Sequence, residues 1–313
     1  MLRITFSAFL IANIIGCSSP TANEDDAKKP AGDMLAFESS VKHNRDIFIM
    51  DADGKNVRNL TNDSAVDVEP CWSPDGKYVA FSSNRDDKKF DLYKTDIATG
   101  ETTRLTSDTS SMDAQPTWSP DGNCIAFMSD REKGKYGIFI LDMKTMAVTP
   151  YTSGAGDYSQ PSWSPDGKQL AFIYNADYRK TQNWDVYTNN FPAGADEMKK
   201  LTTYDGTDFS PTWHPSLNKI IFMSIQNNNE DLYEIDLNTM KIAQLTTEKS
   251  SEDMPSISPD GKYIAFMQAG EKNGKETHEI GMITADGKTV QIIGDSLSPD
   301  RSEERRVGKE CRL

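Results

Sequence analysis

Acidic side chains stand shortly before a repeated proline at five places along the chain. They are Asp67 with Glu69, Asp113, Asp157, Asp208, and Glu252 with Asp253. Carboxylates that converge repel one another unless a cation lies among them, so such a set suits a divalent ion or a partner's Lys or Arg. Each aspartate can instead bond main-chain N–H groups of its own loop. Both interpretations stay open, and the metal is unspecified.

Other chemistry-bearing residues are sparse. The chain has three histidines, His43, His214 and His278, and none stands at a metal-ligand spacing. His214 occupies a turn position that serine fills in other repeats, which favours a turn role. No phosphate-binding glycine loop, Cys-x-x-Cys pair or Gly-x-Ser-x-Gly elbow occurs. The sequence therefore predicts no catalytic residues and no certain cofactor.

The elements that must position the carboxylates come from an internal repeat. The motif Trp-Ser-Pro-Asp-Gly begins at Trp72, Trp118 and Trp163, and returns in altered form at Trp213 and Ile257. The spacings are 46, 45, 50 and 44 residues, which is the period of propeller blades. Each copy is followed by an apolar triplet such as Val79-Ala80-Phe81, and a sixth triplet lies at 35–37.

Two further segments complete each unit. One reads Asp-Ile-Phe or Asp-Leu-Tyr, as at Asp46, Asp91 and Asp231, and the other ends in Leu-Thr, as at Leu105-Thr106. Four short segments rich in β-branched and aromatic residues, divided by turn signals, make a four-stranded antiparallel unit. In the turn, proline presets φ, aspartate bonds the local backbone and glycine takes the positive φ. We therefore expect an all-β fold, a six-bladed β-propeller of four-stranded blades whose C-terminal end is incomplete.

The full pattern is P-x-W-S-P-D-G-x-x-(I/L/V)-A-F, then D-(I/L)-Y, then R/Q-L-T. It resembles the TolB-type propeller repeat, a WD-repeat-like family that typically closes as six blades. The resemblance covers about residues 34 to 295 and implies the propeller fold. The family's namesake is a periplasmic protein, so the resemblance also implies a place in the cell envelope.

In a propeller the acidic residues fall in the loops from the outermost strand of one blade to the innermost strand of the next. These loops would ring one mouth of the central channel, together with the loops between second and third strands. The longest of the latter contains Tyr178, Arg179 and Trp184. Exposed aromatics with arginine are common interface anchors, so we predict the partner surface here. Alternatively, Trp184 folds back on its own blade.

Both ends of the chain stand apart from the repeats. Arg3 and the apolar run 4–15 resemble a signal peptide over residues 1–16, followed by Cys17 in a context like a bacterial lipobox. We expect lipid on Cys17, a flexible linker over 17–33 and membrane contact through that anchor alone. Residues 301–313 begin RSEERRVGKEC, which resembles a translated sequencing adapter. We therefore expect an artefact tail, with the natural protein continuing beyond Asp300.

The domain organisation that follows is one propeller over 34–300. Its repeats lie near 34–71, 72–117, 118–162, 163–212, 213–256 and 257–300. A ring usually closes by mixing strands from both termini, and Leu297-Ser298-Pro299-Asp300 resembles the strand that the first repeat lacks. The closing strand is therefore expected there or in sequence beyond it.

The net charge limits the classes of partner, and the cysteines limit the possible disulfides. The net charge of −14 becomes −17 when Arg3 and the tail, with five basic and three acidic residues, are left out. So acidic a domain disfavours nucleic acid and favours basic proteins, basic peptides or cations. Cys71 and Cys124 are the cysteines left in the repeats, and we expect buried free thiols, with one disulfide as the alternative.

The sequence thus predicts a lipid-anchored binding module of the bacterial cell envelope. Its partner would be an envelope protein or peptide of basic character, and a saccharide is a further possibility. Two alternatives stay open. One is a glycan-active enzyme, a lyase or hydrolase that uses the carboxylates of the channel mouth. The other is a structural accessory subunit of an envelope complex.

Overall fold

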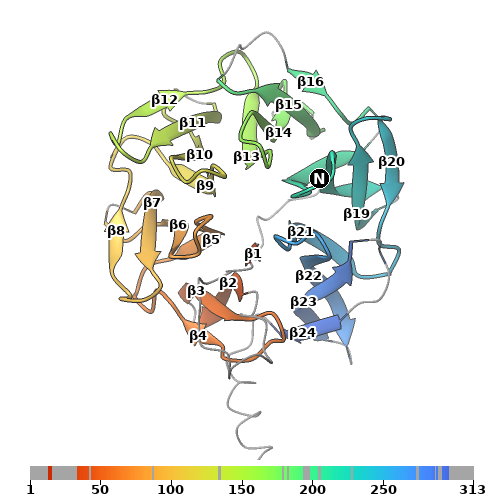
Figure 1. Cartoon of the computed structure of the whole chain (residues 1–313), viewed down its shortest axis with the longest axis horizontal. Helices are drawn as coiled ribbons and strands as arrows, with labels where there is room; N and C mark the ends of the chain where they lie inside the picture. The colour runs from red at the N-terminus through yellow and green to blue at the C-terminus, as the bar shows by residue number, and fades with distance from the viewer. Residues whose placement is uncertain are drawn as a thin grey trace, which may run out of the picture.

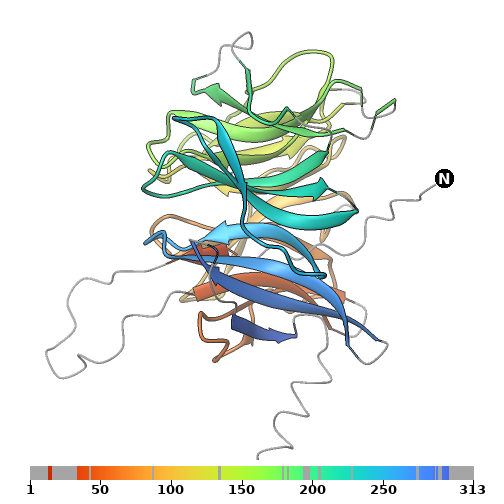
Figure 2. The ribbon, with the colours of Figure 1, turned by 90° about the vertical axis from the view of Figure 1, so that its right-hand side faces the viewer.

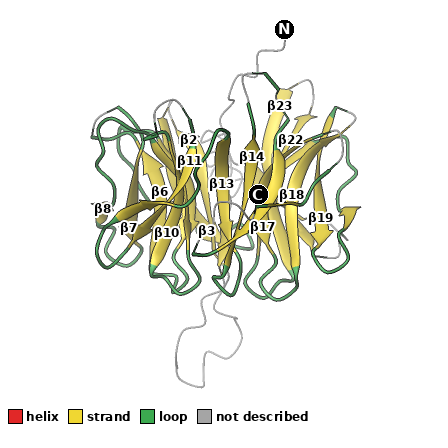
Figure 3. Ribbon diagram, turned by 90° about the horizontal axis from the view of Figure 1, so that it is seen from above, coloured by secondary structure: helices red, strands yellow, loops and turns green. Residues whose placement is uncertain are grey.

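The computed structural model describes residues 13–15, 34–41, 44–86, 88–132, 135–177, 180–181, 183–192, 198–203, 206–226, 228–272, 275–285, 287 and 291–295. In these residues the chain forms six four-stranded antiparallel sheets arranged around a central channel (Figure 1). The predicted all-β, six-bladed propeller is confirmed. We number the blades 1 to 6 in chain order, and Figures 2 and 3 show them from two further directions.

The strands run from the channel outward in each blade, with consecutive strands hydrogen-bonded to each other. Blade 1 contains β1 (Asn13–Ile15), β2 (Met34–Val41), β3 (Asn44–Asp51) and β4 (Arg58–Asn59). Blade 2 contains β5 (Asp67–Trp72), β6 (Tyr78–Ser83), β7 (Asp91–Asp96) and β8 (Thr102–Arg104). Blade 3 contains β9 (Asp113–Trp118), β10 (Cys124–Ser129), β11 (Gly137–Asp142) and β12 (Val148–Pro150).

The other three blades repeat this order. Blade 4 contains β13 (Asp157–Trp163), β14 (Gln169–Asn175), β15 (Asp185–Asn190) and β16 (Lys199–Lys200). Blade 5 contains β17 (Thr207–Trp213), β18 (Lys219–Gln226), β19 (Asn229–Asp236) and β20 (Lys241–Gln244). Blade 6 contains β21 (Ser251–Ile257), β22 (Tyr263–Lys272), β23 (Lys275–Thr284) and β24 (Gln291–Asp295). From blade 2 onward the tryptophan, or Ile257 in its place, ends the innermost strand, so each blade begins a few residues before it.

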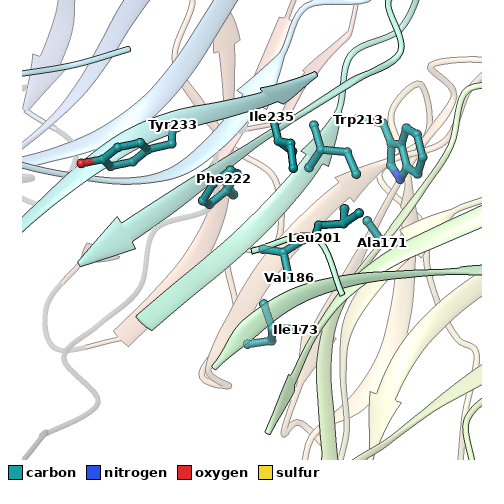
Figure 4. Packing of buried hydrophobic residues seen from close by; sticks show 9 residues of the cluster. Ala171, Ile173, Val186, Leu201, Trp213, Phe222, Tyr233 and Ile235 are labelled. Carbon is teal, nitrogen blue, oxygen red and sulfur yellow. The ribbon is translucent and has the colours of Figure 1, made fainter. Parts of the chain in front are cut away.

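The core is divided among the seams between blades. Each of six buried apolar clusters joins residues of two neighbouring blades, and the second strands supply apolar residues to both faces. Figure 4 shows the seam between blades 4 and 5, which includes Ala171, Val186, Trp213, Phe222 and Ile235. The apolar triplets predict this arrangement, because a strand covered on both faces loses the alternation of a half-exposed one.

The Ser-Pro-Asp-Gly turns are built as expected. In blade 2, Ser73 Oγ donates to Asp75 Oδ1 at 2.7 Å and accepts from the N–H of Tyr78 at 3.0 Å. Gly76 has a φ of 69°, in the left-handed region that glycine tolerates best. In blade 5 the Nδ1 of His214 accepts the N–H groups of the next turn residues instead. The predicted turn role of His214 is confirmed.

The Leu-Thr motif joins the third strand of a blade to the chain that follows the fourth. Thr106 Oγ1 accepts the N–H of Leu92 at 3.0 Å, and the same bond recurs in the blades that contain Thr61, Thr152, Thr202 and Thr246. The aspartate that opens the third strand bonds the fourth, as Asp231 does with Gln244 at 3.1 Å. Both motifs therefore stabilise the fold.

Blade 1 obtains its innermost strand from the N-terminal side. The strand β1 pairs with β2 in the register Asn13↔Ala36, Ile14↔Leu35 and Ile15↔Met34. It comes from the segment that the sequence assigns to a signal peptide. Residues 297–300, which we expected to supply a closing strand, lie outside the described residues, as do Cys17 and the tail 301–313.

Two smaller findings concern the cysteines and the membrane. Cys71 and Cys124 are both free thiols, as expected, but each is only partly buried. Over the described residues, we find no helix with the length and apolar character needed to cross a bilayer.

Candidate binding surface at the channel mouth

The predicted carboxylates lie where the chain enters each innermost strand, but they do not form one even ring. Asp67, Asp113, Asp208 and Glu252 occupy equivalent positions, two residues before a bulge in the strand. In blade 4 that position is Tyr158, so Asp157 lies one residue earlier, whereas Asp253 lies one residue later than Glu252. All of these side chains are buried.

In blades 2 and 3 the carboxylate is neutralised by an arginine of the same blade. Nη2 of Arg85 donates to both oxygens of Asp67 at 2.9 and 3.1 Å, and Nη2 of Arg131 donates to both oxygens of Asp113 at 2.8 Å. The arginines follow the second strand by two residues. A buried carboxylate needs such a partner, because burial without one disfavours the charged form.

Each of these arginines also lies over an aromatic pair. The guanidinium carbon of Arg131 is 5.4 Å from the ring centre of Phe127 and 4.8 Å from that of Phe139. Its Nε donates to Ser129 Oγ at 3.0 Å. Arg85 makes the same contacts with Phe81, Tyr93 and Ser83. We call this carboxylate, serine and aromatic pair the guanidinium cradle.

Blade 5 has the cradle with a different residue in the arginine position. Asp208 pairs with Ser224 as Asp113 pairs with Ser129. The rings of Phe222 and Tyr233 lie 6.0 Å apart, close to the 6.1 Å of Phe127 and Phe139. The residue two positions after Ser224 is Gln226, whose Nε2 donates to Ser224 Oγ at 3.3 Å. Figure 4 shows Phe222 and Tyr233 on neighbouring strands of this blade.

Blade 6 carries two adjacent buried acids. Oε1 of Glu252 accepts from Ser250 Oγ at 2.5 Å, and burial raises the pKa of this carboxyl. Burial raises the pKa of Asp253 to about 6, although the hydrogen bond that it accepts from the N–H of Met254 acts to lower this pKa. Asp157 in blade 4 accepts the N–H of Tyr136 at 3.0 Å. Asp253 thus bonds a main-chain group of its own loop, whereas Asp157 bonds one in the preceding blade and Glu252 bonds a serine hydroxyl.

Glu69 belongs to a second set that lines the channel. It is the bulge residue of blade 2, and the equivalent positions are Gln115, Gln160, Ser210 and Met254, all with φ between 52° and 59°. The bulge takes their N–H groups out of the strand ladder. Glu69 Oε2 accepts the N–H of Gln115 at 2.7 Å, and Gln115 Oε1 accepts that of Gln160 at 2.9 Å.

The chain of bonds continues around much of the channel. Gln160 Oε1 accepts the N–H of Ser210 at 2.7 Å, and Ser210 Oγ donates to Asp253 at 3.2 Å. At its other end Glu38, whose pKa burial raises to about 8, accepts the N–H of Glu69 at 3.3 Å. Of these bulge residues the sequence pointed to Glu69 alone, although the set has a simple signal: each bulge residue immediately precedes the repeated proline.

The predicted aromatic anchor has another place. Trp184 is half-buried and packs against the seam between blades 4 and 5, the alternative that the sequence left open. Tyr178 and Arg179, like His43, lie outside the described residues. Among the residues that are described, no group of three or more His, Cys, Asp or Glu is placed to hold a metal ion.

Comparisons with known proteins agree on the repeat. A family model described as TolB beta propeller domain matches residues 14–109, 86–182 and 115–303. The chain is similar to a TolB homolog of Chlorobaculum tepidum, at 38% identity over 69 residues, which cover 22% of this chain and 16% of the relative. The Tol-Pal system protein TolB of Desulfosudis oleivorans is 33% identical over 51 residues, covering 16% and 12%.

The fold is also found in a solved structure. The crystal structure of TolB from Acinetobacter baumannii superposes with a TM-score of 0.70 at 24% identity. The match covers 83% of this chain and 63% of the other, so this chain spans less than two thirds of its relative. At that identity the likeness concerns the fold alone.

Proposed function

The chain belongs to the TolB β-propeller family, and from this premise we propose that it is a binding module of the bacterial cell envelope whose channel mouth holds a basic side chain of a protein or peptide. Relatives that carry the name Tol-Pal system protein TolB support an envelope location. On this proposal lipid on Cys17 tethers the propeller to a membrane, and the mouth faces its partner.

The observation that carries the proposal is the contrast between blades 3 and 5. Blade 3 shows which cation the guanidinium cradle accepts, because Arg131 occupies it within the same chain. Blade 5 repeats the aspartate, the serine and the aromatic pair, but the residue in the arginine position is the uncharged Gln226, which donates to Ser224. An arginine from a partner could lie over the rings of Phe222 and Tyr233 and reach Asp208, as Arg131 lies over its aromatic pair and reaches Asp113 in blade 3.

The charge of the chain supports a basic partner. With a net charge of −14, the protein attracts cationic segments and slows the approach of nucleic acid and anionic lipid. A guanidinium is favoured over an ammonium in this cradle, because its planar fork meets a carboxylate with two donors and stacks on aromatic rings. A neutral saccharide would not use it.

A lipid anchor has a consequence for blade 1. Cleavage before Cys17 removes β1, and the inner edge of β2 then exposes unpaired main-chain groups. Another strand must cover that edge in the mature protein.

The test is direct binding of a defined peptide to the full chain. The probe is the acetylated and amidated pentapeptide Gly-Ser-Arg-Ser-Gly, with lysine and norleucine in place of arginine as comparison peptides. Isothermal titration should show the arginine peptide binding best. Gln226→Arg and Asp208→Asn should each weaken it by about tenfold, because a charge-assisted hydrogen bond contributes on the order of 1.5–3 kcal/mol.

The control variant is Glu101→Gln, on an exposed turn between the outer strands of blade 2, which should bind as the unmodified protein does. Equal affinity for the norleucine peptide, or full affinity in Gln226→Arg, would contradict the proposal. Turnover of a polysaccharide by the purified protein with added divalent metal would instead favour the enzyme alternative.

A further inference from the structure

A pocket of about 330 Å³ lies between blades 3 and 4, at the opposite end of the innermost strands from the channel mouth. Blade 3 contributes the turn around Asp121 and the side chain of Cys124. Blade 4 contributes Trp163, the turn around Asp166, and Phe191. Its volume is at the lower end of the range of small-ligand sites, which begins at about 300 Å³.

The pocket exists because one side chain in blade 3 is small. Cys124 donates its N–H to Ser119 Oγ at the end of the turn. The same bond identifies Tyr78, Gln169 and Tyr263 as its equivalents, and the matching turn bond of His214 identifies Lys219. Each of these four side chains is much larger than cysteine, so among blades 2 to 6 blade 3 has the smallest side chain at this described position.

A second substitution in blade 3 changes the charge at the same place. In the other Ser-Pro-Asp-Gly turns the aspartate lies near a lysine two residues later, at 3.3 Å in blade 2, 3.9 Å in blade 4 and 2.8 Å in blade 6. In blade 3 that residue is Asn123, whose Nδ2 donates to Asp121 Oδ2 at 2.8 Å. The bonds of Asp121 thus come from neutral groups, and its negative charge is kept at the rim of the pocket.

The wall of the pocket is aromatic. The rings of Trp163 and Phe191 meet edge to face, with centroids 4.8 Å apart. Nε1 of Trp163 donates to the carbonyl of Thr117 at 3.2 Å, so its polar group is satisfied and fixed. Aromatic rings next to a carboxylate attract a cation and cover its apolar stem.

We propose that this pocket binds a primary ammonium on an apolar stem, the side chain of a lysine on a partner protein. Three features converge on that ligand: the space left by Cys124, the aromatic wall, and the charge of Asp121 without its lysine. Both oxygens of Asp121 accept bonds from neutral donors, Oδ1 from Ser119 Oγ and the N–H of Asn123 and Oδ2 from Nδ2 of Asn123, so these bonds leave the charge of the carboxylate in place. A carboxylate whose two oxygens already accept other bonds suits the point charge of an ammonium better than the two-pronged guanidinium, which needs both oxygens at once.

This pocket lies on the opposite face of the propeller from the cradle of blade 5, and its proposed ligand is an ammonium rather than a guanidinium. Its proposal does not depend on the function assigned to the mouth, and each can fail alone. The two would engage different side chains of a partner.

Cys124 provides the measurement, because it lines the pocket while Cys71 serves as an internal reference. Burial raises the pKa of Cys71 to about 11, which makes this thiol slow to alkylate. The probe is Nα-acetyl-lysine methylamide, added to the full chain before iodoacetamide. Peptide mass spectrometry then reports the alkylation rate at Cys124. We expect the probe to lower that rate at least about twofold near its Kd and to leave the rate at Cys71 unchanged.

The matched variant is Asn123→Lys, which gives blade 3 the lysine that three other turns already have and is therefore compatible with folding. It should weaken protection of Cys124 by about tenfold, whereas Gln226→Arg should leave protection intact. Cys124→Tyr fills the pocket as in blades 2 and 6, and ligand-observed NMR should show no binding to it. Equal protection by the norleucine derivative, tighter binding of the arginine derivative, or unchanged protection in Asn123→Lys would overturn the proposal.

Discussion

Blades 3 and 5 place the same carboxylate at the channel mouth and surround it differently. Asp113 is held by Arg131 from its own blade, while Asp208 lies in an equivalent cradle with Gln226 in the arginine position. The two blades share the strand register, the serine and the aromatic pair. The residue after the serine thus differs between a position that an arginine of the same blade occupies and the position in which we propose a partner's cation.

The contrast shows that spacing alone does not identify a site. Acidic residues recur before each proline with nearly the same period, yet Asp67 and Asp113 form ion pairs with arginines of their own blades. The informative residue is the one two positions after the serine of the second strand. It is Arg85 in blade 2, Arg131 in blade 3 and Gln226 in blade 5. A carboxylate of this kind is structural when its own blade supplies the arginine.

The sharpest way to test this contrast is to remove the two aspartates in turn. Asp113→Asn leaves the guanidinium of Arg131 half-buried without its charge partner, and we expect the free energy of unfolding to fall by about 3 kcal/mol. The residue in the arginine position of blade 5 is the uncharged Gln226, so Asp208→Asn should cost less, at most about 1 kcal/mol. Urea unfolding followed by tryptophan fluorescence measures both. Equal losses would show that the two positions do not differ.

The buried acids of blade 6 predict that the free energy of unfolding depends on pH. Burial raises the pKa of Asp253 from 3.8 to about 6, so its protonated form is favoured in the folded state. Its stabilising contribution is complete below pH 3.8 and is lost as pH rises through about 6. Asp253→Asn should therefore gain about 2 kcal/mol relative to the unmodified protein between pH 4 and pH 8.

Urea unfolding across that range gives the measurement. Asp260→Asn is the control, since hydrogen bonds from Lys262 and Ser258 lower the pKa of Asp260 to about 2. Its loss should change the pH dependence only below about pH 4, and in the opposite direction. If the difference in the free energy of unfolding between Asp253→Asn and the unmodified protein did not change with pH, burial would not favour the protonated form of Asp253.

The bulge residues test whether neighbouring blades are joined at the channel. Gln115→Leu removes the acceptor for the N–H of Gln160, and a buried unpaired donor costs about 1–2 kcal/mol. Met254→Leu is the matched control, because Met254 occupies the equivalent bulge with a thioether in place of an amide. Hydrogen exchange at the amide of Gln160 should rise in the first variant alone. If hydrogen exchange at this amide did not change, the hydrogen bond between Gln115 and Gln160 would not couple the two blades.

Most of the fold could be predicted because its determinants are local and repeated. The turn residues, the apolar triplets and the Leu-Thr ends each act within one blade, and each is found where the pattern places it. The site was harder, because its contacts join residues about 18 positions apart, as with Asp113 and Arg131. The offset of Asp157 depends on the register of its strand relative to the bulge, which the spacing of acidic residues does not reveal.

The smallest effect comes from converting blade 5 into blade 3. Gln226→Arg adds a guanidinium next to Asp208, Ser224 and the rings of Phe222 and Tyr233. We expect a gain of about 0.5–1 kcal/mol, because the new pair is offset by the cost of ordering a long side chain and by its partial exposure. Calorimetry should show a small rise in Tm, and the reverse change, Arg131→Gln, should lower it. If arginine in blade 5 lowered stability, the cradle there would not accept a guanidinium, and the likeness between the two blades would stop at their backbones.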